Sequence, residues 1–204
     1  MNLTLWGRLL TAASIATCAC CLGSASPAHA DPGVQVDAAP PLSQPFLPWL
    51  DPFLYASVPG GSFEPGTAPW QVTGPGSVIA DNEPWHVGGA GGSALSLRSG
   101  ASAASPPFAI GLLWPTVRFF VRSTSLLPSV AAVSVEIDIG SSTLTLPVGV
   151  VAATSGWQPS LPLPLLANAT SVLGGSFATA RLKVTALVGD VRVDDVYVDP
   201  FKTS

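Results

Sequence analysis

The chain has 204 residues, of which 48% are hydrophobic and only 10% are charged, with a formal net charge of −4. Its eight Lys and Arg residues are scattered, which argues against the basic patch that nucleic-acid binding requires. Low charge can accompany disorder, but disorder also needs low hydrophobicity, so this apolar composition predicts a folded domain.

Residues 1–30 have the pattern of an export signal. Arg8 is their only charge, the apolar run "LLTAASIATCACCLG" follows it, and "SASPAHA" ends in a small-x-small cleavage pattern. We therefore expect a secreted protein that is cleaved after Ala30. The alternative is a lipid anchor on Cys18, although Thr17 stands where a lipoprotein signal has Gly, Ala or Ser.

Cleavage at that point would remove all three cysteines, Cys18, Cys20 and Cys21, and one of the two histidines. The remaining chain would have no disulfide and no thiol ligand, and His86 would be its only histidine. These features argue against cysteine-based catalysis and against a His-rich zinc site. No other apolar run is long enough to span a bilayer.

Residues 31–59 are expected to form a Pro-rich extended arm or linker. Proline recurs every few residues, so neither a helix nor a central strand can run through the segment. The stretch "FLPWLDPFLY", residues 46–55, is too apolar for a purely solvated tether. We expect it to lie against the domain or against a protein partner.

From residue 60 onward, short apolar runs alternate with turn signals. The stretch "TVRFFVRST", residues 116–124, predicts a strand with Val117, Phe119 and Val121 on one face. The opposite face would carry Arg118, Phe120 and Arg122. The same period of two recurs in residues 130–140, 142–151, 177–188 and 190–199. About seven to nine strands at about ten-residue spacing predict a single all-β sandwich or jelly roll over 60–204.

Two motifs carry a resemblance to a known family. "GGSFEPGTAPWQV", residues 60–72, resembles the first strand of exported galactose-binding-like modules, of which carbohydrate-binding modules are the best-known members. "VRVDDVYVDPF", residues 191–201, is similar to the last strand of the same modules. The whole of 60–201 also resembles secreted proteins of high-GC actinobacteria. This resemblance implies a galactose-binding-like jelly-roll β-sandwich, a fold that hosts many functions.

The resemblance also implies a structural calcium ion, because the first-strand Glu and the last-strand Asp of such modules commonly share one. By that comparison Glu64 and Asp194 would be ligands, with Asp195, Asp81 or Glu83 as further candidates. Carboxylates without thiols or imidazoles suit the hard oxygen shell that calcium prefers.

The residues themselves leave another interpretation of these carboxylates open. Asp195 could be solvated, and Asp194 could pair with Arg192, with Arg181 or with a backbone N–H. Val193 and Val196 are three residues apart yet both suit the core, which predicts a β-bulge at Asp194–Asp195.

Exposed aromatic rings are the side chains that stack on sugars. Trp85 and His86 lie in the Gly-rich stretch "DNEPWHVGGAGG", and Trp114 precedes a predicted strand in "GLLWPT". These three residues are the candidate ligand-binding residues, because loops on a rigid scaffold often carry recognition. The alternative is that both tryptophans seal an edge of the sandwich. Trp70 and Trp157 are expected in or near the core.

Three functions are compatible with this sequence. The favoured one is a secreted, non-catalytic binding module for a carbohydrate or cell-envelope glycan. The second is a structural or interaction protein of the cell surface that uses residues 46–55 to bind a partner. The third is a hydrolase with His86 as general base, which is the weakest because "GGSALS" lacks the second glycine of a nucleophile elbow.

Overall fold

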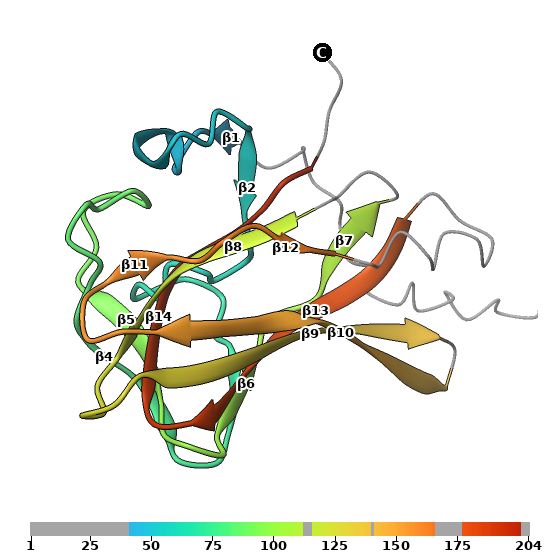
Figure 1. Cartoon of the computed structure of the whole chain (residues 1–204). Coiled ribbons are helices and arrows are strands. Elements are labelled where there is room, and N and C mark those ends of the chain that lie inside the picture. The colour runs from blue at the N-terminus through green and yellow to red at the C-terminus, as the bar shows by residue number, and fades with distance from the viewer. Residues whose placement is uncertain (1–40, 112–115, 140, 166–176, 201–204) are drawn as a thin grey trace, which may run out of the picture. The chain divides into compact units, whose positions relative to one another are not determined.

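The computed structural model describes residues 41–111, 116–139, 141–165 and 177–200, which all belong to one compact unit (Figure 1). The predicted export signal, the alternative anchor at Cys18, the start of the arm and Trp114 lie outside the described residues. No helix in the described part of the chain is long and apolar enough to cross a membrane.

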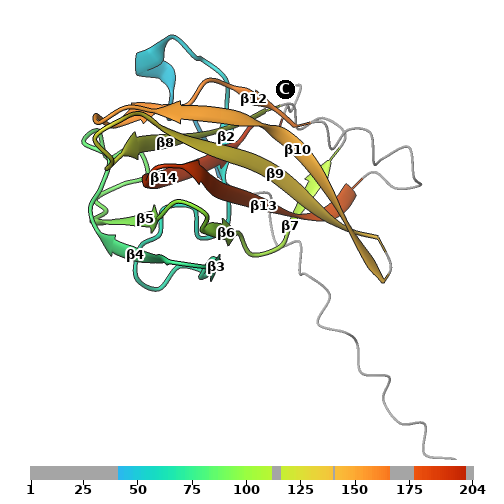
Figure 2. The same ribbon diagram turned by 60° about the horizontal axis from the view of Figure 1, so that its bottom comes forward.

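The described residues form two antiparallel β-sheets (Figures 1 and 2). Sheet A contains β1 (Leu42–Ser43), β2 (Tyr55–Ser57), β4 (Gly76–Ala80), β5 (Ser93–Leu97), β8 (Thr116–Ser123), β11 (Gln158–Pro159), β12 (Leu163–Pro164) and β14 (Val191–Val198). Sheet B contains β3 (Gln71–Thr73), β6 (Ser102–Ala104), β7 (Phe108–Gly111), β9 (Ser129–Ile139), β10 (Ser142–Ala153) and β13 (Phe177–Val188). The all-β sandwich predicted from the sequence is confirmed.

The core lies between the two sheets and follows from the alternation of the strands. Val117, Phe119 and Val121 of β8 are fully buried in it, together with Val133 and Val135 of β9 in sheet B. The other face of β8 carries the side chains of Arg118, Phe120 and Arg122. That outer face of sheet A is therefore the one that has polar and aromatic side chains to offer.

The predicted arm is part of sheet A over residues 42–57. Its β1 pairs with β2, and β2 continues the sheet by pairing with β14 through Tyr197↔Ser57 and Val198↔Ala56. A 3-10 helix, η1 (Leu47–Trp49), lies between β1 and β2 in the blue segment at the top of Figure 1. The apolar stretch 46–55 thus lies against the domain, and the boundary expected at residue 60 falls beyond strands that the sheet already includes.

The last strand contains the predicted bulge. The pairing of β14 with β8 is regular up to Asp194↔Phe120 and resumes only at Tyr197↔Arg118. Asp195 adopts a positive φ of 47°, which lets both Val193 and Val196 point into the core, where both are fully buried. On the opposite edge β14 pairs with β5 before the bulge and with β2 after it. The bulge therefore lies where the neighbour of β14 on that side changes from β5 to β2.

Candidate functional site

The bulge brings buried carboxylates together. Asp194 and Glu83 are fully buried and Asp195 is nearly so. The Asp194 carboxylate accepts the backbone N–H of Glu83 at 3.0 Å and that of Asp195 at 2.8 Å. Of the partners that the sequence left open for Asp194, a backbone N–H is the one that the structure contains. Arg192 pairs with Asp81 instead, and Arg181 pairs with Asp138.

The same carboxylates hold the Gly-rich loop that carries Trp85 and His86. Glu83 accepts the backbone N–H groups of Trp85 and Val87, and Asp195 accepts that of Gly88 at 2.9 Å. A Cβ at Gly88 would lie 2.1 Å from Asp195 Oδ1, so the loop can approach the bulge only with glycine at this position.

Glu64 holds the other end of this loop. Its Oε1 accepts the N–H groups of Gly92 and Ser93 at 2.8 and 2.9 Å, where β5 begins. Glu64 lies in the turns between β2 and β3 rather than in the first strand that the resemblance implied, but it is close enough to β14 to contribute to the electrostatics of Asp195. Asp81, which the sequence offered as a further ligand, pairs with Arg122 and Arg192 rather than with this carboxylate cluster.

Burial and mutual repulsion dominate the electrostatics of the cluster. Burial, followed by the charge of Asp195, raises the pKa of Asp194 to about 8. Burial, together with the nearby negative charges of Glu83 and Glu64, raises the pKa of Asp195 to about 7. In the described part of the chain, no Lys or Arg forms an ion pair with Glu83, Asp194 or Asp195.

The donor type of this cluster suits a hard cation such as calcium, because its side-chain donors are carboxylate oxygens without an ion-paired Lys or Arg among the described residues. The described residues contain no group of three His, Cys, Asp or Glu side chains already arranged to hold a metal ion. Backbone N–H groups use some of the oxygen lone pairs. In this structure the carboxylates of Glu64, Asp194 and Asp195 accept backbone N–H groups.

An aromatic cluster covers part of the outer face of sheet A next to this loop. Trp85 packs edge-on against Trp49, with 4.9 Å between ring centroids, and lies 5.5 Å from Phe120 of β8. Phe46, Tyr55 and Tyr197 complete the buried part of the cluster. Trp85 itself is 45% exposed, so one ring of the cluster remains open to solvent.

His86 lies beside Trp85 but has no catalytic surroundings in the described residues. It is exposed, has a positive φ of 53°, and its Nδ1 lies 2.9 Å from the side-chain nitrogen of Asn82. A general base of a serine hydrolase needs a serine on one ring nitrogen and an orienting acceptor on the other. The geometry therefore gives no support to hydrolysis at His86.

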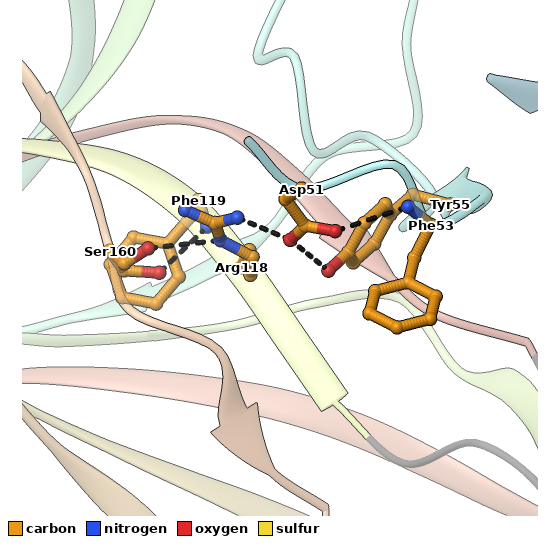
Figure 3. Close-up of polar contacts among 6 residues, drawn as sticks. All are labelled: Asp51, Phe53, Tyr55, Arg118, Phe119 and Ser160. Carbon is orange, nitrogen blue, oxygen red and sulfur yellow. Dashed lines mark hydrogen bonds and ion pairs between the residues drawn. The ribbon is translucent and has the colours of Figure 1, made fainter. Parts of the chain in front are cut away.

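A buried ion pair fastens the segment 46–55 to the outer face (Figure 3). Asp51 pairs with Arg118 of β8 and also accepts the Tyr55 hydroxyl at 2.7 Å. Arg118 Nε donates to the Ser160 carbonyl at 3.0 Å, and its guanidinium lies 4.2 Å from the ring centroid of Phe46. Burial, followed by the hydrogen bond to Asp51, raises the pKa of Tyr55 to about 12, so its hydroxyl remains a donor.

The comparisons with known proteins concern the fold. No known protein-family model matches this chain, and no curated protein matches it. The chain is similar to the CBM22-1 xylan-binding domain of Paenibacillus barcinonensis Xyn10C, with a TM-score of 0.50 and 14% identity over 82% of this chain and 100% of that one. The two chains share a β-sandwich fold. At this identity the likeness shows the β-sandwich alone.

Two further solved structures are similar at lower scores. One contains the CBM22-1 and GH10 modules of Clostridium thermocellum xylanase 10B complexed with xylohexaose, with a TM-score of 0.49 and 14% identity over 74% of this chain. This chain spans only 28% of that one. The other is an adhesin domain of Lys-gingipain from Porphyromonas gingivalis, with a TM-score of 0.45 and 11% identity over 65% of this chain and 91% of that one.

Sequence reasoning found Trp85 but missed the residues around it. Trp49 and Phe46 belong to the segment expected as an arm, and Arg118 and Arg122 were placed only on the outer face of a strand. The alternation of "TVRFFVRST" was the available signal, because it places two arginines on a face that the core does not use.

Proposed function

We propose that the chain is a secreted, non-catalytic binding module for a carbohydrate, and that it binds the sugar on the outer face of sheet A. The observation that carries this proposal is Trp85, whose ring is 45% exposed and is fixed by ring contacts to Trp49 and Phe120. An aromatic ring that is already immobilised offers an apolar face to a pyranose ring with little further loss of side-chain entropy.

The surroundings of Trp85 suit a sugar in a second respect. The loop backbone is held by the carboxylates of Glu83, Asp195 and Glu64, so Trp85 is mounted on a rigid support. Charged side chains of Asp81 and Arg122 lie on the same outer face, which offers hydrogen-bonding groups of both kinds beside the ring. A sugar presents apolar faces and hydroxyl edges, and this combination recognises both.

The experiment is binding of the purified protein, with calcium present, to soluble and insoluble polysaccharides and cell-wall preparations. Intrinsic tryptophan fluorescence and pull-down are the readouts. We expect saturable binding to at least one polymer, and its loss in Trp85→Ala. Phe53→Ala is the matched control, because Phe53 is an exposed aromatic residue outside the ring cluster. Absence of binding across the panel by the folded protein would contradict the proposal.

Calcium at the bulge is part of the same proposal. Glu64, Asp194 and Asp195 would hold the ion, and its role there would be to neutralise the buried carboxylates and stiffen the loop. It would not take part in sugar recognition directly, because the carboxylates lie beneath the loop rather than on the exposed ring.

A second candidate function rests on exposed apolar side chains around η1. Leu47, Leu50, Phe53 and Leu54 are all exposed, and Leu50 is 93% exposed at a positive φ of 60°. Exposed apolar groups of this kind are typical of protein interaction surfaces. If this surface binds a protein or a second copy of the chain, Leu50→Asp should abolish an association seen by analytical ultracentrifugation and leave glycan binding unchanged.

A further inference from the structure

Two arginines lie side by side on the outer face of sheet A. Arg122 of β8 and Arg192 of β14 are directly opposite one another in the antiparallel pairing. Their side chains are 27% and 26% exposed, so both are partly open to solvent although their Nε atoms are buried. Like charges placed directly across a sheet repel one another, so this arrangement requires an anion between them.

Asp81 supplies one carboxylate for both arginines. Its Oδ2 accepts from Arg192 Nη1 and lies 3.0 Å from Arg122 Nη2. The other ion pairs of the described residues match one cation with one carboxylate: Arg118 with Asp51, Arg181 with Asp138, and Lys183 with Glu136. Within the described residues, the Arg122–Arg192–Asp81 group therefore carries one positive charge that no second carboxylate neutralises.

A third donor lies beside the arginine pair. The guanidinium of Arg122 is 5.4 Å from the ring centroid of Trp157, which is half-buried at the start of β11. The Nε1 of Trp157 and the Nε atoms of both arginines are buried and have no hydrogen-bond partner among the described residues. Buried donors are normally satisfied, so three of them in one place show that this group is short of acceptors among the described residues.

The site adjoins the aromatic cluster of the proposed function. Phe120, against which Trp85 packs, lies between Arg118 and Arg122 on the outer face of β8. Arg118 is buried with a carboxylate of its own, Asp51, whereas Arg122 and Arg192 are partly exposed and share the single carboxylate of Asp81. A saccharide chain stacked on Trp85 would therefore run beside two guanidinium groups.

We propose that Arg122 and Arg192 bind the carboxylate of an acidic saccharide, a uronic acid unit, with Trp157 packing against its ring. This inference rests on the proposed function and names the ligand class of that face. A guanidinium presents a planar pair of N–H donors that matches the two oxygens of a carboxylate. In the ion pairs with Asp81, each arginine uses one terminal nitrogen, and both contact the same oxygen, Oδ2. The net charge of −4 does not oppose it, since screening confines such contacts to about 10 Å.

The test compares polygalacturonate with the same polymer after its carboxyl groups have been reduced to alcohols. Neutral xylan and galactan, and dextran sulfate, complete the panel. We expect the purified protein to bind polygalacturonate at least about tenfold more tightly than the reduced polymer, with affinity that falls as salt is added. Arg122→Gln and Arg192→Gln should each remove this preference. Arg181→Gln, which deletes the same charge from sheet B, should keep it.

The outcomes separate the inference from the proposed function. Equal binding of charged and reduced polymers, unaffected by Arg122→Gln but lost in Trp85→Ala, would overturn the inference and leave the sugar-binding function standing. Dextran sulfate bound as tightly as polygalacturonate would overturn the carboxylate assignment. No binding to any polymer would overturn both. Because Arg122→Gln leaves Asp81 with one partner, its melting temperature is measured first, and Arg122→Lys, which keeps the charge but not the planar fork, should bind with intermediate affinity.

Discussion

Glu83 donates its backbone N–H to the carboxylate of Asp194, which lies 111 residues further along the chain, at 3.0 Å. This bond joins the loop of Trp85 to the bulge of the last strand. The loop cannot be held by strand pairing, because β14 changes its edge partner there from β5 to β2. Carboxylates take the place of the missing ladder bonds.

The first prediction concerns Glu83. Glu83→Ala leaves the N–H groups of Trp85 and Val87 without their acceptor, so we expect the free energy of unfolding to fall by about 2–4 kcal/mol. Urea unfolding of the variant measures this. Glu136→Ala is the matched control, since it breaks only a partly exposed ion pair with Lys183 and should change stability by less than about 1 kcal/mol. An equal effect of both variants would contradict the anchoring role of Glu83.

The second prediction concerns calcium. An ion present at about a hundred times its dissociation constant should stabilise the fold by about 2.7 kcal/mol, which raises the melting temperature by about 5–10 °C. Melting curves in calcium and in EDTA measure the shift, and magnesium at the same concentration tests for a general salt effect. Glu64→Gln should reduce the calcium-dependent shift, whereas Glu136→Gln should not. A melting temperature that chelation leaves unchanged would rule out the proposed ion.

The bulge and the loop that contacts it show which features of the site could be predicted from the sequence and which could not. Strand periodicity predicted both faces of β8, and the spacing of Val193 and Val196 predicted the irregularity in β14, because each depends on neighbours along one strand. The position of the Gly-rich loop could be predicted from the sequence. Its contact with Asp195 could not, because that contact joins two segments that are far apart in the chain.

The carboxylate partners of Arg118 and Arg122 could not be predicted from the sequence for the same reason. Arg118 and Arg122 have the same place in the alternation, yet one is buried by Asp51 and the other shares Asp81 with Arg192. Asp51 lies 67 residues before Arg118, in a segment whose prolines argued against a helix or a central strand. Only the pairing of β2 with β14 brings that segment over β8.

The third prediction tests this attachment. Arg118→Ala leaves the Asp51 carboxylate buried without its cation and uncovers the ring of Phe46, so we expect a loss of about 3–5 kcal/mol in the free energy of unfolding. We also expect faster proteolysis within residues 41–55. The double variant Asp51→Leu with Arg118→Met should lose less than Arg118→Ala alone, because no charge remains buried. A double variant that is less stable than the single one would contradict the argument.

The fourth prediction concerns Asp199, which is buried just after β14. Burial, followed by the negative charge of Asp51, raises its pKa above the ordinary value. A carboxyl with a raised pKa in the folded state binds its proton more tightly there than in the unfolded chain, so its contribution to stability is greatest in acid and is lost as the pH rises through the folded-state pKa. Asp199→Asn has no ionisable group at this position, so it does not lose stability in this way as the pH rises.

The measurement for Asp199 is the melting temperature of Asp199→Asn and of the unchanged protein across a pH series. We expect the variant to be the more stable at neutral pH, and the difference to shrink as the pH falls below the ordinary carboxyl pKa of about 3.9, where both side chains are neutral. Its backbone N–H, which donates to the Thr116 carbonyl at 2.9 Å, is the same in both proteins and cancels in the comparison. A variant that is less stable than the unchanged protein at neutral pH would show that the ionised Asp199 makes a favourable contact that outweighs its burial.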